Sequence, residues 1–249
     1  MEGVDTSAVK RVKERATGLA FYSIDESGER NYVFYRFPGY ADPESYLRPE
    51  DIKPDYIGKS KVFHFSESLL RKNETRDAVL YALEAAKKKL VLVSYDPNVR
   101  ITLWKNRNEL ISVQKKVIQY VDIFVSTSTE ASFITGKKAA DESLNKILDL
   151  GPKIVLIRMK NHYLAGSVEG ILKIPMFIVK AVDTSGAGDA FDAGFLTGLI
   201  KNWPLEKAVL LGSAVAAIKV TKIGTRTGLP SFEEAVNFMT SYGKDRLTK

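Results

Sequence analysis

The chain has 249 residues, of which 45% are hydrophobic, and this is enough to bury the core of one large domain. It contains no cysteine, which excludes disulfide bonds, thiolate metal sites and a cysteine nucleophile. The net charge of +7 suits an anionic ligand or nucleic acid. Because the lysines and arginines are spread along the chain and no nucleic-acid-binding motif is present, nucleic-acid binding is the weaker of these expectations.

No apolar run reaches the length needed to cross a bilayer, and the best candidate, Ala208 to Val220, carries Lys219. Met1 leads into the charged stretch Lys10–Arg15 rather than into a signal peptide. We therefore expect a cytoplasmic protein that does not contact a membrane.

The first predicted element is a β-hairpin. Two β-rich runs, Gly18–Ile24 and Arg30–Phe37, are joined by the turn-forming residues Asp25–Gly28. The later elements are predicted in chain order as strand Lys61–Phe65, helix Glu74–Lys89 with Asn73 as N-cap, strand Leu90–Tyr95, helix Glu109–Gln119, strand Val121–Val125, helix Glu142–Leu148, strand Lys153–Ile157, two β segments within Ile171–Val179 interrupted by Pro175, and helices Asp189–Ile200, Leu205–Thr221 and Phe232–Tyr242. This alternation of strands and helices predicts βαβ units around a parallel sheet.

The segment Asp183-Thr-Ser-Gly-Ala-Gly-Asp189 ends where an apolar helical pattern begins. Gly186, Ala187 and Gly188 let the backbone approach a ligand, and the N–H groups at a helix start attract negative charge. A carboxylate repels phosphate, so Asp189 beside such a site is suited to removing a proton from an attacking hydroxyl. The alternative is that Asp189 only caps the helix.

This segment resembles the C-terminal signature D-T-x-G-A-G-D of the ribokinase-like carbohydrate kinases and matches it at every fixed position. The resemblance implies a single domain over residues 1–249 with a three-layer α/β fold, a mostly parallel central sheet and a small β lid at about residues 17–38. It also implies an anion hole at Gly186, Ala187 and Gly188, and a catalytic base at Asp189. The implied cofactors are ATP and Mg²⁺, and the resemblance admits a monovalent cation. Exposed lid sheets in this family commonly pair, which predicts a homodimer through the lid.

A second motif concerns the substrate. Asp96 follows a predicted strand, the place where ligands collect at the edge of a parallel sheet. The pattern Asp96-Pro-Asn98-Val-Arg100, with Leu103-Trp104 after it, resembles fructokinases and 2-keto-3-deoxygluconate kinases within the family. Phe34-Tyr-Arg36 resembles the aromatic and arginine residues that these sugar-acid kinases use on the lid. The resemblance implies substrate contacts at Phe34, Arg36, Asn98 and Arg100. Two arginines near one ligand favour a sugar acid, so 2-keto-3-deoxygluconate is the first expectation and fructose the second.

Three further positions carry expectations that the resemblance supplies. Glu130 stands where the family places an acid near the hydrated magnesium, although Thr127 replaces the expected Asn. Arg158 is within reach of a phosphate of the nucleotide, in a segment where Lys160 and Tyr163 replace small residues of the family. Gly224 lies in the stretch Ala214–Pro230, which resembles the closing element beside the adenine pocket.

Aligned by its motifs, the chain begins where the family is past its first strand and its Gly-Gly-x-x-x-Asn sugar motif. We therefore expect an N-terminally shortened member that binds nucleotide better than sugar. The rival hypotheses are a non-catalytic nucleotide- or sugar-binding homologue and a basic nucleic-acid-binding protein.

Overall fold

The computed structural model describes residues 3–24, 30–35 and 42–247, which form two compact units. Unit 1 comprises Met1–Val93 and Asn98–Val113, and unit 2 comprises Ser94–Pro97 and Gln114–Lys249. The expectation of one domain over residues 1–249 stays a prediction. Within the described residues, no helix is long and apolar enough to span a bilayer.

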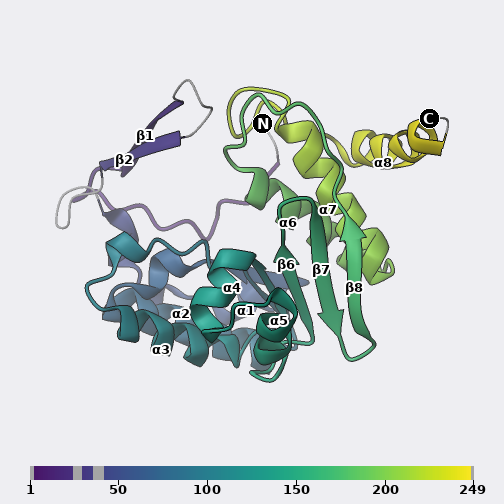
Figure 1. The fold of residues 1–249 in the computed structure, drawn as a ribbon. Coiled ribbons are helices and arrows are strands. Elements are labelled where there is room, and N and C mark those ends of the chain that lie inside the picture. Colours follow the sequence, from purple (N-terminus) through teal and green to yellow (C-terminus); the bar gives the residue numbers. More distant parts are fainter. Residues whose placement is uncertain (1–2, 25–29, 36–41, 248–249) are drawn as a thin grey trace. The chain divides into compact units, whose positions relative to one another are not determined.

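Unit 1 contains the predicted hairpin (Figure 1). Its antiparallel strands are β1 (Leu19–Ile24) and β2 (Arg30–Tyr35), and Phe21 pairs with Val33. The other elements of unit 1 are α1 (Pro54–Ile57), β3 (Val62–Phe65), α2 (Asn73–Lys88) and most of α3 (Arg107–Ile118). Strand β4 (Leu92–Tyr95) begins in unit 1 and ends in unit 2.

Both ends of α2 differ from the prediction. Lys72, not Asn73, is the N-cap, and the first turn is held by the Thr75 hydroxyl, which donates to the Lys72 carbonyl at 3.1 Å. At the other end Leu90 is left-handed, with φ 56, and the Val91 N–H bonds the Ala86 carbonyl at 2.9 Å. This turn closes the helix, so the following strand starts at Leu92 and Leu90 is exposed rather than buried.

Unit 2 contains the rest of the sheet and the C-terminal helices. Its elements are β5 (Ile123–Thr127), α4 (Ser128–Thr135), α5 (Ala140–Leu148), β6 (Ile154–Arg158), β7 (His162–Ser167), β8 (Gly170–Pro175), α6 (Ala187–Ile200), α7 (Leu205–Lys219) and α8 (Phe232–Leu247). The sheet order is β3-β4-β5-β6-β7-β8. Strands β4, β5 and β6 run parallel, and β7 and β8 extend the sheet as an antiparallel hairpin. The predicted α/β fold with a mostly parallel sheet and a small separate β sheet is confirmed.

The strands of unit 2 are covered on both faces, which gives the three predicted layers (Figure 1). Tyr163 and Ala165 on β7 pack with Phe191 and Phe195 of α6 in one apolar core. Gly166 lies on the opposite face of β7, where a Cβ would clash with the side chain of Leu144 on α5. The sheet of unit 2 therefore lies between α5 on one side and α6 with α7 on the other.

Helices α6 and α7 approach each other closely through glycines. A Cβ on Gly198 would lie 2.7 Å from the Cα of Ala208, and one on Gly212 would lie 2.7 Å from the carbonyl oxygen of Phe191. The two backbones can reach this distance only because neither position carries a side chain. This contact fixes the position of α6, the helix that follows the signature segment.

The prediction of two β segments within Ile171–Val179 is wrong. A single strand ends at Pro175, which has no N–H to continue a ladder, and residues 176–182 form no strand. Strand β7 and helix α4 were not predicted. The polar and small residues of His162–Ser167 hide the strand pattern, and α4 follows β5 without a separating loop.

Candidate phosphoryl-transfer site

The signature segment forms a loop that leads into α6. Gly186 is the N-cap of the helix and has a φ of 70, a left-handed conformation that glycine adopts without strain. Asp189 lies exposed in the first turn. The alternative reading of Asp189 as the N-cap is therefore wrong. The Ala187 N–H already donates to the Thr184 carbonyl at 3.2 Å, so the remaining first-turn amides are the better anion donors.

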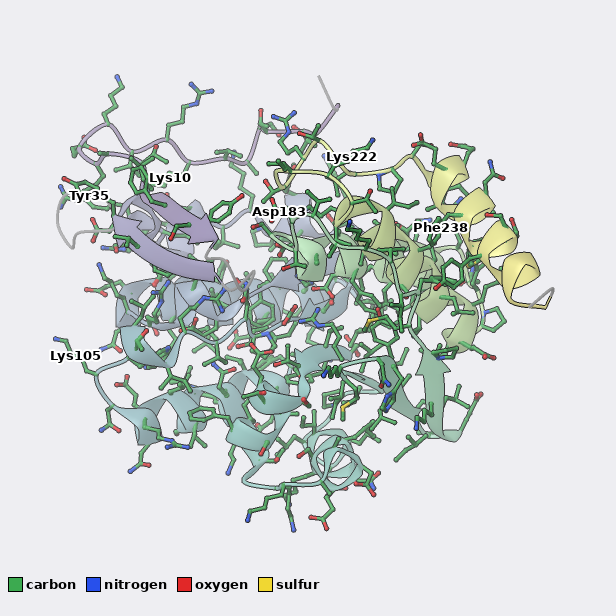
Figure 2. All side chains as sticks on the ribbon, turned by 45° about the horizontal axis from the view of Figure 1, so that its top comes forward. Lys10, Tyr35, Lys105, Asp183, Lys222 and Phe238 are labelled. Atoms are coloured by element: carbon green, nitrogen blue, oxygen red, sulfur yellow. The ribbon has the colours of Figure 1, made fainter. Side chains whose placement is uncertain are left out.

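Asp183 lies at the start of the loop (Figure 2). Its side chain is buried and accepts two backbone hydrogen bonds. Its Oδ1 accepts from the Ser185 N–H at 2.8 Å and its Oδ2 from the Gly224 N–H at 2.9 Å. Burial by itself raises the pKa of Asp183, but these bonds and the nearby charge of Lys219 together hold the pKa well below its usual value. Asp183 is therefore an ionised anchor between the signature loop and the loop that follows α7.

Arg158, at the end of β6, is held between two acids. Its Nη2 lies 2.7 Å from Asp96 Oδ2 and its Nη1 lies 3.3 Å from Asp192 Oδ1. All three side chains are largely buried. Burial lowers the pKa of the Arg158 guanidinium, yet the charges of Asp96 and Asp192 outweigh this and raise it, so the group stays protonated. Burial, and then the charge of Asp96, raise the pKa of Asp192 well above its ordinary value.

This ion-pair network lies directly beside the signature loop. A Cβ on Gly188 would be 3.5 Å from Arg158 Nη1, so Gly188 and the guanidinium lie in van der Waals range of each other. The charge of Asp189 also acts on Asp192. The site thus places one fixed cation and one exposed carboxylate at the first turn of α6, an arrangement suited to holding a phosphoryl group next to a base.

Glu130 has a local structural role. Its Oε2 accepts from the Thr127 N–H at 2.9 Å and from the Thr127 hydroxyl at 2.7 Å, while the Thr127 side chain accepts from the Glu130 N–H at 3.3 Å. These bonds form a capping box at the start of α4. Threonine makes this cap where the family pattern has asparagine. Glu130 is also close enough to Arg158 for its charge to raise the pKa of the guanidinium.

The turn between β6 and β7 accommodates the two large side chains that replace small residues. Tyr163 is buried, with its ring stacked on Phe191 at a centroid distance of 4.7 Å. Lys160 is exposed in the turn. Tyr163 therefore belongs to the core of unit 2 and leaves the surface of the turn to Lys160.

The substrate residues expected from the second motif belong to unit 1. Asn98 is exposed and left-handed, with φ 47. Arg100 is exposed, and its Nη1 makes long bonds of 3.4 Å to the carbonyls of Asn98 and Val99. Phe34 lies on β2 and lines a cavity of about 600 Å³ within unit 1. Arg36 lies outside the described residues.

This cavity has an anchored aromatic wall. Trp104 lines it, and the indole Nε1–H donates to Glu67, which is buried. Arg71 also lines it and pairs with Glu67 at 3.7 Å. Burial raises the pKa of Glu67, and the Trp104 bond and the charges of Arg71 and Arg100 oppose this rise. The volume suits a small-molecule ligand.

Sequence reasoning found the signature loop but missed several supporting residues. The motif contains Asp183 but does not indicate what this residue does. No functional role was predicted for Asp192, Lys219 or Glu67. Asp192 follows Asp189 by three residues, so it lies on the same face of α6, and this spacing is a signal that could have identified it. Glu67 and Lys219 offer no comparable signal, because charged residues usually lie at the surface.

The chain is similar to known proteins along most of its length. Residues 1–231 match the model of the family described as pfkB family carbohydrate kinase. The chain is 34% identical over 202 residues to an ATP-dependent 6-phosphofructokinase of Thermoanaerobacterium thermosaccharolyticum, a match that covers 81% of this chain and 61% of that protein. It is 32% identical over 252 residues to fructokinase-2 of Solanum lycopersicum, covering 95% of this chain and 74% of that protein.

Solved structures have the same fold. A fructokinase of Xylella fastidiosa with bound ATP gives a TM-score of 0.81 at 23% identity, covering 94% of this chain and 76% of that chain. An aminoimidazole riboside kinase of Salmonella enterica, complexed with its riboside and an ATP analogue, gives a TM-score of 0.72 at 26% identity, covering 84% of this chain and 70% of that chain. The chain spans less than two thirds of the length of the phosphofructokinase and about three quarters of the length of the two fructokinases.

Proposed function

The chain belongs to the pfkB family of carbohydrate kinases, and we propose that it is an ATP-dependent kinase that transfers the γ-phosphate to a hydroxyl group of a sugar or sugar acid. The observation that carries this proposal is the position of Asp189. Its carboxylate is exposed in the first turn of a helix whose N-cap glycine leaves backbone amides directed outward. A base beside an anion site is what phosphoryl transfer requires.

In the proposed mechanism Asp189 removes the proton from the attacking hydroxyl. The first-turn amides around Gly188 hold the charge that develops on the transferred phosphoryl group, and the helix dipole adds to this. Arg158, kept in place by Asp96 and Asp192, supplies a fixed positive charge beside Gly188. These donors are already oriented before the substrate arrives, so they need no reorganisation during the reaction.

Magnesium is expected with ATP. Among the residues that the structure describes, no cluster of three or more histidine and acid side chains could hold a metal ion by itself. The donor set therefore fits an ion carried mainly by phosphate and water oxygens, with Glu130 as the protein contact that we propose. When bound, Mg²⁺ would neutralise charge on the phosphates.

For the acceptor, two candidates have separate support. A sugar acid, first among them 2-keto-3-deoxygluconate, is favoured by the exposed guanidinium of Arg100 and by the basic residues Arg71, Lys72 and Lys105 at the cavity of unit 1. Fructose is favoured by the fructokinases among the relatives. The phosphofructokinase relative makes fructose 6-phosphate a third acceptor to include in a test.

A coupled assay of ADP release tests the proposal. The purified chain is incubated with MgATP and, in turn, with 2-keto-3-deoxygluconate, fructose and fructose 6-phosphate, and the product is identified by mass spectrometry. We expect a phosphorylated product with at least one acceptor and none with Asp189→Asn. Binding of ATP or sugar by calorimetry without any product would instead support a non-catalytic homologue.

We also propose that the chain forms a homodimer through the β1-β2 sheet. Leu19, Phe21, Val33 and Tyr35 lie on one face of this sheet, because Leu19 pairs with Tyr35 and Phe21 with Val33. All four side chains are exposed, from 45% for Tyr35 to 66% for Val33. Such a contiguous apolar face is typical of a protein–protein interface.

A further inference from the structure

Lys219 is the last residue of α7 and its side chain is fully buried, with 0% of its surface exposed. Lysine is almost never buried without partners, because removing an ammonium group from water is costly unless opposite charge or hydrogen bonds compensate for it. Its Nζ donates to the Asp183 carbonyl oxygen at 2.7 Å. The ammonium is thus directed at the first residue of the signature loop.

Asp183 supplies the opposite charge. Its carboxylate is buried next to Lys219 and accepts the N–H groups of Ser185 and Gly224. One residue therefore receives the ammonium on its carbonyl and two amides on its carboxylate. The three segments that meet there are the end of α7, the signature loop and the loop after α7.

Backbone contacts bring the same three segments together. The N–H groups of Val182 and Asp183 both donate to the Val220 carbonyl, at 2.7 and 3.0 Å. Gly228 packs so closely that a Cβ there would lie 2.5 Å from the Lys219 carbonyl oxygen. The end of α7, the signature loop and the loop after α7 are therefore in direct backbone contact around the lysine.

We infer that Lys219 is a positioning residue that acts as a built-in cation, holding the signature loop and with it the first-turn amides and Asp189 in the geometry for phosphoryl transfer. This inference rests on the proposed function. Lys219 contacts the loop at Asp183 and lies outside the reacting groups, so it acts through the loop. A displacement of about 1 Å in such a loop can cost on the order of 10²-fold in rate.

The hydrogen bond from Lys219 to the Asp183 carbonyl does not fit a site in which a bound monovalent cation supports this loop. Such an ion needs buried carbonyl and carboxylate oxygens. At Asp183 the carbonyl already accepts from the Lys219 ammonium, and the two carboxylate oxygens accept from Ser185 and Gly224. We therefore expect a kinase whose activity does not depend on K⁺.

The first experiment uses the unaltered protein. Kinase activity is measured with K⁺ as the only monovalent cation and then with tetramethylammonium, which is too large for a buried oxygen site. We expect kcat to differ by less than about twofold, since the positive charge is part of the chain. A tenfold or larger requirement for K⁺ would overturn the inference.

The second experiment removes the charge. Lys219→Ala and Lys219→Met are compared with Lys146→Met, a matched control at an exposed lysine of α5. We expect kcat to fall at least tenfold in both Lys219 variants while Lys146→Met keeps its activity. Added ammonium or methylammonium should restore Lys219→Ala, which leaves room for the ion, and should not restore Lys219→Met. Loss without rescue in both variants would show that the lysine matters only for packing.

A third measurement is independent of turnover. Hydrogen exchange is followed for peptides covering residues 183–189 and 224, and we expect faster exchange in Lys219→Met than in Lys146→Met. If the unaltered protein phosphorylates no acceptor but exchange changes in this way, the proposed function fails and the positioning role stands. Unchanged exchange would overturn that role. Should the Lys219 variants not fold, exchange in the unaltered protein is compared in potassium and tetramethylammonium chloride, and greater protection in potassium would refute the inference.

Discussion

The carboxylate of Asp183 holds the backbone amide of Gly224 at 2.9 Å across a sequence separation of 41 residues. Gly224 has a φ of 90, a conformation that favours glycine, so its amide is directed at the acid by the turn itself. The signature loop and the loop after α7 are in this way parts of one structure. A substitution in either loop should therefore alter the conformation of the other loop.

Asp183→Asn tests this link. Asparagine has a single acceptor oxygen, so one of the two amides would face an N–H group, and we expect the free energy of unfolding to fall by about 1–3 kcal/mol at pH 7. The pKa of Asp183 is lower in the folded protein than in the unfolded chain. Its contribution is therefore complete above about pH 4 and is lost as the pH falls further. Urea denaturation between pH 3 and pH 7 measures this, with Asp141→Asn, an exposed acid, as the control. A difference between variant and parent that did not shrink at low pH would contradict the assignment.

Asp189→Asn should abolish turnover and leave the fold unchanged. A positioned base contributes about 10²–10⁴ in rate, and asparagine cannot accept the proton. Because Asp189 is exposed, we expect no measurable change in Tm. Single-turnover kinetics and calorimetry with ATP check the two parts. If kcat stays above about half of its original value, Asp189 is not the base.

Arg158→Met should destabilise unit 2 in a pH-dependent way. It would leave Asp96 and Asp192 side by side without their shared cation, at a cost of about 3–5 kcal/mol. The pKa of Asp192 is already raised by burial, by Asp96 and by Asp189, and Arg158 is the group that opposes this. The penalty is therefore small where Asp192 is protonated and grows as the pH rises through its folded pKa.

The measurement for Arg158→Met is urea denaturation at pH 5 and pH 8. Lys137→Met is the matched control, because it breaks an exposed ion pair with Glu142 at 3.5 Å, and its effect should stay within about 1 kcal/mol at both pH values. A penalty, taken as the difference from the parent, that is smaller at pH 8 than at pH 5 would rule out this account of the network.

Arg100→Ala distinguishes the two acceptor classes. If the acceptor is a sugar acid, the variant loses a charge-assisted pair worth about 1.5–3 kcal/mol, so KM for 2-keto-3-deoxygluconate should rise about tenfold or more. KM for fructose should change much less, because fructose carries no charge. Steady-state kinetics on both acceptors make each substrate the control for the other. Equal losses would remove the support for a sugar acid.

Val33→Asp should prevent dimer formation through the β1-β2 sheet. A charge in the middle of the apolar face has to be desolvated on association. Val168→Asp introduces the same charge at a position that is 98% exposed in the β7-β8 turn and should leave the dimer intact. Analytical ultracentrifugation of both variants and the parent reads out the mass. A monomeric parent, or a dimer in the Val33 variant, would exclude this interface.

The signature loop was predictable because its chemistry is local. Gly186 must be left-handed, and Asp189 follows it within one turn, so neighbouring residues in the sequence define the site. The network of Arg158 with Asp96 and Asp192 was not predictable, because its members lie 62 and 34 residues apart and meet only when the sheet is formed. Arg158 is held by these two acids beside Gly188, and its contact with a phosphate of the nucleotide stays a prediction.

The burial of Lys219 could not be predicted from the sequence either. A lysine at the end of a helix usually reads as a solvated cation that suits the helix dipole, and only the folded structure reveals that this one is enclosed. Among the elements, β7 was missed because its alternation is carried by small and polar residues. The pairing of β1 with β2 was predicted because the sequence between the two strands is rich in turn-forming residues.

The glycine contacts between α6 and α7 affect how the results of a mutational scan of this chain are interpreted. Gly198 and Gly212 admit no Cβ without moving a backbone, so selection for function in a library of variants should deplete changes there as strongly as changes at Asp189. The cause would be steric, since these positions face a neighbouring helix. Positions of α6 that tolerate no substitution would then have two unrelated causes, the close packing of helices and the chemistry of the site. A scan that measures protein abundance as well as activity would separate these causes.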